Sequence, residues 1–157
     1  MLNIDNITFE SNEMPDFWEK PLLQSHRLTA SDLAAMPDDT KDLDRLKALL
    51  YDYMHLKLGN YAKLEAMCDI KADTFQKKIR YKNSRPIDYI FLAKFCIGAK
   101  LNEKEARELF LLMGHILDER NRYDYILLHE LRREGTLEDY DADMIKYGDG
   151  SILSRAD

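Results

Sequence analysis

The sequence lacks an apolar run of the ~20 residues that a membrane-spanning helix requires. Its most apolar stretch, residues 89–99, is interrupted by Lys94. The N-terminal residues have neither the basic start nor the apolar centre of a secretory signal. The two cysteines, Cys68 and Cys96, form no CxxC pair, so we expect them to be reduced and buried. These absences predict a cytoplasmic protein without a membrane partner.

Signatures of metal binding and catalysis are also missing. The four histidines have no metal-ligand spacing, and HELRRE, which begins at His129, lacks the second histidine of HExxH. The acids of residues 139–150 imitate a calcium loop, but Met144 replaces its glycine and Gly150 replaces its glutamate. No serine, histidine and aspartate form a recognisable catalytic motif. We therefore expect no enzyme activity, no metal ion and no cofactor.

Positive charge is scarce and concentrated. The 157-residue chain has a net charge of −6, which argues against indiscriminate coating of DNA or of anionic membranes. Residues 1–46 hold 10 acidic and 4 basic side chains, and residues 130–157 hold 8 and 4. Residues 60–86, which we call the basic segment, reverse this balance with 7 basic and 3 acidic side chains. Such a local reversal indicates a surface for an anionic partner.

The apolar spacing is helical almost throughout and predicts an all-α fold. Helices are expected over residues 41–58, 60–68, 72–81, 102–113 and 120–133, with another starting at Pro86. Short helices are expected before Pro37 and after Thr136, and Asn102 with Glu105 matches a helix-capping pair. We predict an N-terminal arm over 1–40, a helix-turn-helix domain over 41–114 and a helical extension over 115–157.

Apolar residues at three- and four-residue steps define the expected buried faces of these helices. The predicted inward residues are Leu43, Leu46, Leu50, Tyr53 and Met54 in the first helix, Leu64 and Met67 in the second, and Phe75 and Ile79 in the third.

The second and third helices, joined by a short turn, have the dimensions of a helix-turn-helix unit. With Phe75 and Ile79 inward, the polar side of the third helix can face base edges in a major groove. This side carries Asp73, Gln76, Lys77 and Arg80. Phosphate contacts, which give affinity but little sequence information, are expected from the flanking residues Lys63, Lys71, Lys82, Asn83 and Arg85.

Residues 43–114 resemble a Cro-type DNA-binding domain of the lambda-repressor-like (XRE) family, a compact bundle of five helices. The resemblance lies in LEAMCDIKADTFQKKI (64–79) and SRPIDYIFLAKFCIGAKLNEKEARELFLLMG (84–114). It implies a sequence-specific transcriptional regulator from a bacterium or a mobile element, with double-stranded DNA as partner. By position, it implies base reading by Ala72, Asp73, Gln76, Lys77 and Arg80, and a phosphate contact by Asn60.

Four positions depart from the family pattern. A glutamine near the start of the second helix is missing, and Glu65 stands where a small residue is common. Asp69 replaces the glycine of the turn, and Tyr81 replaces the glycine after the third helix. These departures, together with the net negative charge, favour an alternative in which the same bundle binds a protein, as an antitoxin or inhibitor does.

The predicted helix over residues 120–133 is apolar on more than one side. It can cover the domain core, or part of it can form the homodimer seam that a reader of palindromic DNA needs. The sequence fits both interpretations of this helix. For the chain as a whole, RNA binding is a weaker third possibility beside DNA and protein binding, because no aromatic stacking platform is evident.

Overall fold

The computed structural model describes residues 41–80 and 86–154, and these residues fold as helices without a strand. The helices are α2 (Leu43–Tyr53), α3 (Tyr61–Cys68), α4 (Ala72–Ile79), α5 (Tyr89–Gly98), α6 (Glu103–Met113), α7 (Arg122–Arg132) and α8 (Leu137–Tyr147). A π-helical turn, Met54–Leu58, continues α2. The predicted all-α fold is therefore confirmed for these residues. The predicted N-terminal arm lies outside them.

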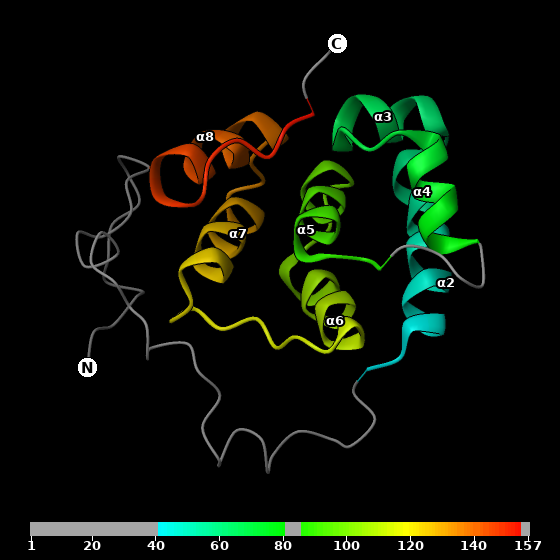
Figure 1. Ribbon diagram of the computed structural model, residues 1–157, viewed down its shortest axis with the longest axis horizontal. Helices are drawn as coiled ribbons and strands as arrows, with labels where there is room; N and C mark the ends of the chain where they lie inside the picture. The colour runs from blue at the N-terminus through cyan, green and yellow to red at the C-terminus, as the bar shows by residue number, and fades with distance from the viewer. Residues whose placement is uncertain (1–40, 81–85, 155–157) are drawn as a thin grey trace.

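Helix α5 is the centre of the molecule (Figure 1). All eight residues from Phe91 to Gly98 are buried, because α3, α6, α7 and α8 all pack against this helix. Helices α2 and α4 lie together on one side, and α7 and α8 lie on the other (Figure 1). One hydrophobic core joins both sides, so the predicted C-terminal extension packs against the same helix that supports the helix-turn-helix unit.

Side chains next to the helix starts decide where the helices begin. Asn102 accepts a hydrogen bond from the Glu105 N–H while the Glu105 carboxylate accepts one from the Asn102 N–H, which confirms the predicted capping pair. Thr136 caps α8 in the same way, with Asp139 as its partner. The prediction that Pro86 starts a helix was wrong. Asp88 accepts a hydrogen bond from the Phe91 N–H, so α5 begins three residues later, at Tyr89.

Two predicted core residues point into solvent. Leu43 is 41% exposed because it is the first residue of α2 and no preceding turn covers it, and Met67 is 44% exposed. Helix α3 buries Leu64 and Cys68, which lie one turn apart, and this rotates the intervening Met67 outward. The other apolar residues predicted to face inward in α2 to α4 are buried or half-buried.

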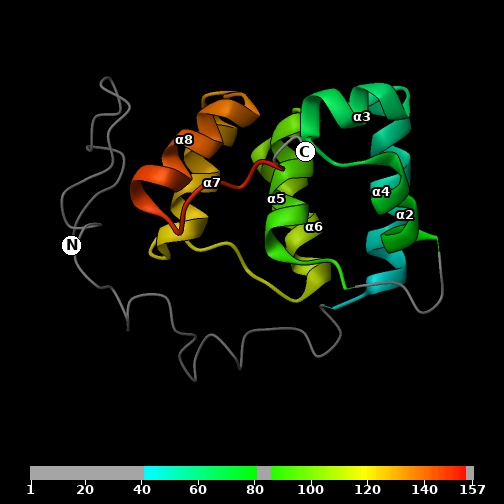
Figure 2. The ribbon, with the colours of Figure 1, turned by 45° about the horizontal axis from the view of Figure 1, so that its top comes forward.

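The segment after α8 returns across the molecule. In Figures 1 and 2 it runs from α8 past α5 towards the end of α3. At its end, the Ser154 N–H donates a hydrogen bond of 2.6 Å to Asp69 Oδ2, joining residues that are 85 positions apart. The C-terminal part of the described chain is thereby attached to the turn between α3 and α4.

Candidate nucleic-acid interface

The turn between α3 and α4 is built around Asp69. This residue adopts the left-handed conformation, with φ 55° and ψ 40°, and its N–H donates to the Glu65 carbonyl to end α3. Its carboxylate also accepts a 2.9 Å hydrogen bond from Lys94 Nζ of α5. Burial alone would raise the pKa of Asp69, but the Ser154 N–H and the Lys94 ammonium outweigh it and lower the pKa below its ordinary value. The backbone angles at position 69 favour glycine, but the Asp69 carboxylate also bonds to the buried Lys94, which glycine could not do.

Helix α4 is anchored by aromatic packing. The Phe75 side chain is fully buried and stacks on Phe91 and Phe95 of α5, with ring centroids 6.2 and 5.8 Å apart. Ile79 is half-buried one turn later. Because the apolar side of α4 is fixed to α5, its opposite side is held outward at the surface.

The structure places all five predicted base-reading residues in or next to α4. Asp73, Lys77 and Arg80 are exposed, whereas Ala72 and Gln76 are half-buried. Lys77 Nζ lies 3.0 Å from Asp73 Oδ2 as an i,i+4 ion pair. Both side chains are well exposed, so this pair contributes only about 0.3–0.5 kcal/mol and can be exchanged for another partner.

The predicted phosphate contacts are only partly described. Lys63 and Lys71 are exposed at the starts of α3 and α4. Asn60 caps α3 by accepting a hydrogen bond of 2.9 Å from the Lys63 N–H, so its carbonyl oxygen is engaged within the helix while its amide N–H₂ can still donate. The remaining three predicted contacts, Lys82, Asn83 and Arg85, lie outside the described residues.

Acidic groups lie at both ends of α4, and sequence reasoning missed their arrangement. At the N-terminus, the Ala72 N–H donates a 2.9 Å hydrogen bond to Glu65 Oε2 of α3. At the other end, Arg80 lines a hollow of about 320 Å³ together with Asp44, Asp52 and the basic Lys47 of α2. The Glu65 carboxylate thus places a negative charge at the positive end of the α4 dipole. The interface is therefore a mixture of charges rather than a uniformly positive face.

Lys78, a member of the basic segment, has a structural role. Its Nζ donates a 2.8 Å hydrogen bond to the Pro86 carbonyl and lies 5.1 Å above the ring of Phe91. These contacts hold the two sides of the link between α4 and α5 together. A pattern in the sequence does not separate this lysine from its exposed neighbour Lys77, because only the folded structure shows that Pro86 lies within its reach.

The apolar residues of α7 are used within the chain itself. Tyr125, Ile126, Leu127, Leu128 and Leu131 are all buried against the rest of the core. Of the two interpretations of this helix, the one in which it covers the core explains why these side chains are buried. A homodimer through α7 stays a prediction, and it would have to use the exposed residues of the helix, such as Arg132.

Comparison with known proteins finds no matching family model, no similar curated protein and no similar solved structure. Among the helices of the two described segments, none combines the length and the apolar character needed to cross a bilayer.

Proposed function

We propose that the chain is a DNA-binding transcriptional regulator of the lambda-repressor-like kind, in which α4 enters the major groove. The observation that carries this proposal is the geometry of α3, the Asp69 turn and α4. Two helices of eight residues meet at a left-handed residue, and the second is anchored by Phe75 with its charged side outward. In this proposal α2 to α6 form the five-helix bundle.

The side chains on the outer side of α4 have donors and acceptors that suit base recognition. Lys77 and Arg80 can donate to guanine O6 and N7, and Gln76 can pair with adenine N6 and N7. Asp73 can accept a hydrogen bond from the N4 amine of cytosine, in exchange for its ion pair with Lys77. Ala72 can contact a thymine methyl group. Each good contact of this kind discriminates by about 1–3 kcal/mol.

Residues around α4 would hold the phosphates. Lys71 at the start of α4, Lys63 in α3 and the Asn60 amide are exposed and can donate to phosphate oxygens. In the proposal Lys82, Asn83 and Arg85 complete this set. Positioning by several lysines and arginines predicts affinity that falls steeply with salt, because each neutralised phosphate releases counterions.

Selection of bound fragments from random DNA by the full chain is the decisive test. An enriched motif is expected, with affinity that decreases as salt increases. Replacing Lys77 and Arg80 by alanine should weaken binding to that motif by about 10-fold or more, while far-ultraviolet circular dichroism stays unchanged. Lys104→Ala is the matched control, because Lys104 is exposed on α6, away from α4. Equal binding by the double variant and the control would contradict the assignment of α4.

A second candidate, a protein-interaction module on the same fold, is favoured by one observation. The Glu65 carboxylate occupies the N-terminal N–H of α4, which a DNA reader would keep available for phosphate or bases. A negative charge at this helix end suits a basic protein partner. The selection experiment separates the two candidates, because a protein-interaction module enriches no DNA fragment even at low salt.

A further inference from the structure

A buried cluster of metal-ligand side chains lies between α7 and α8, on the opposite side of α5 from α4. His129 and Glu130 come from the C-terminal part of α7, and Asp143 comes from α8. One ligand atom from each of the three residues lies within 4.8 Å of those of the other two. The sequence does not indicate this grouping, because its third member is 13 residues from the second and on another helix.

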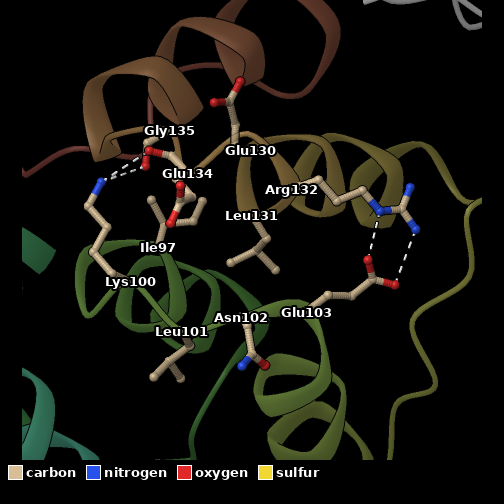
Figure 3. A pocket seen from close by; sticks show the side chains of 10 residues that line it. All are labelled: Ile97, Lys100, Leu101, Asn102, Glu103, Glu130, Leu131, Arg132, Glu134 and Gly135. Atoms are coloured by element: carbon tan, nitrogen blue, oxygen red, sulfur yellow. Dashed lines mark hydrogen bonds and ion pairs between the residues drawn. The ribbon is translucent and has the colours of Figure 1, made fainter.

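Glu130 is the unusual member of this cluster. It is 1% exposed, and neither of its carboxylate oxygens accepts a hydrogen bond. In Figure 3 its side chain points towards α8, away from Leu131 and Glu103, which line the open groove below. Asp143 Oδ2 on α8 likewise has no hydrogen-bond partner. Three carboxylate oxygens without a hydrogen-bond donor, two of Glu130 and one of Asp143, thus lie close together, which is costly unless a positive charge or a proton compensates them.

The surrounding charges compensate only in part. Arg133 Nε lies 3.5 Å from Glu130 Oε1, and His129 Nε2 lies 3.8 Å from Glu130 Oε2. Asp139, on the first turn of α8, adds a further negative charge near Glu130. Lys100 lies near Asp139, so the cation within ion-pair distance of Glu130 is Arg133, and a bound divalent ion would compensate the carboxylates of Glu130 and Asp143 more fully.

We propose that His129, Glu130 and Asp143 bind a divalent transition-metal ion, with Zn²⁺ as the ion that best fits an imidazole and two carboxylates. Zinc bonds to nitrogen and oxygen are about 2.0–2.2 Å long, so tetrahedral donors are about 3.4 Å apart. The separations in the cluster, 3.8 Å for one pair and at most 4.8 Å overall, exceed this value by about 1.4 Å or less, which side-chain rotation can close. Water would supply the fourth ligand.

The Glu130 side chain has room beside the backbone only because residue 135 is a glycine. A Cβ atom at Gly135 would lie 1.9 Å from Glu130 Oε1, so the absence of a side chain at position 135 is what lets Glu130 reach α8. His129 also lines a surface hollow with Tyr125, Arg132 and Arg133. A bound ion would fasten α7 to α8.

Isothermal titration of the metal-free full chain with ZnCl₂, at neutral pH in a non-chelating buffer, tests the proposal. We expect one ion per chain, no comparable binding of Mg²⁺, and a thermal midpoint that rises by about 5 °C or more at a hundredfold excess over Kd. Glu130→Gln and Asp143→Asn should each weaken Zn²⁺ binding by at least about 10-fold. His55→Gln, at an exposed histidine far from the cluster in sequence, should bind as the parent does.

Two outcomes would overturn the proposal. In the first outcome, the parent chain binds no Zn²⁺ and Glu130→Gln raises the thermal midpoint. This result would mean that a proton shared between Glu130 and Asp143, rather than a metal ion, compensates the negative charge of the cluster. Zn²⁺ binding that survives Asp143→Asn but is lost in His55→Gln would place the ion at the surface. Asp143 is partly exposed, so its variant decides the question even if Glu130→Gln fails to fold.

Discussion

Replacing Asp69 by glycine introduces the residue that left-handed backbone angles favour, and we predict that it nevertheless destabilises this protein. Asp69 has a φ of 55°, where a residue with a Cβ atom is strained. Glycine would relieve about 1 kcal/mol of this strain. Considered as a local turn, the variant should therefore be more stable than the parent.

The opposing effect comes from α5. Lys94 is 7% exposed, and its ammonium is bonded to the Asp69 carboxylate at 2.9 Å. Removing one partner of a buried ion pair costs about 3–5 kcal/mol, and the partial exposure of Asp69 places this pair at the low end. Loss of the carboxylate that accepts the Ser154 N–H adds to this cost. The net expectation is a loss of about 2–3 kcal/mol in the free energy of unfolding.

A double-mutant cycle measured by urea unfolding with circular dichroism checks this reasoning. Lys94→Met alone should cost about 1 kcal/mol, because the Asp69 carboxylate it leaves behind can still reach water. Asp69→Gly together with Lys94→Met should return to within about 1 kcal/mol of the parent, since no buried charge remains. A neutral or stabilising Asp69→Gly single variant, or a double variant that adds the two losses, would refute the role assigned to the pair.

Three further perturbations test other parts of the fold by unfolding measurements. Gly98→Ala should destabilise the fold by about 2 kcal/mol or more, because the new Cβ would lie 2.4 Å from Cys68 Sγ and 2.7 Å from Cys68 Cα. Adding Cys68→Ala should restore the lost stability only in part, because the clash with the Cys68 backbone remains. Complete restoration would contradict this backbone clash. Asp124→Ala should lower the free energy of unfolding by about 2–3 kcal/mol, because this fully buried carboxylate accepts hydrogen bonds from the Tyr89 hydroxyl at 2.6 Å and the Asp118 N–H at 3.0 Å. A loss below about 1 kcal/mol would contradict the importance of these hydrogen bonds. Hydrogen bonds from Arg132 lower the pKa of Glu103 from 4.5 to about 2, so the stability that this pair contributes is present above pH 4.5 and is lost as the pH falls towards 2 (Figure 3). Since Glu103 is partly exposed, its ion pair with Arg132 stabilises the fold by on the order of 1 kcal/mol. Arg132→Ala should remove the loss of stability that protonation of Glu103 causes in the parent. An acid transition identical to that of the parent would contradict this role of the ion pair.

The sequence by itself determined the helical class and much of the local organisation. Apolar periodicity located the helices, and the Asn102 cap and the buried Phe75 follow from residues three or four positions apart. Such signals are readable because a helix brings exactly these neighbours together, whatever the rest of the chain does. The start of α5 was misplaced because two residues near each other, Pro86 and Asp88, both favour a helix start, and the stronger side-chain cap prevailed.

Only the tertiary structure decided which charged residues are free to act. Lys94 and Asp69 are 25 positions apart, and Ser154 reaches the same carboxylate from 85 positions away. Lys77 and Lys78 are adjacent in the sequence, yet one is exposed and the other is bonded to the Pro86 carbonyl. The buried acids of α7 and α8 meet in the same way. Contacts of this kind depend on how helices pack, and no local period in the sequence encodes them.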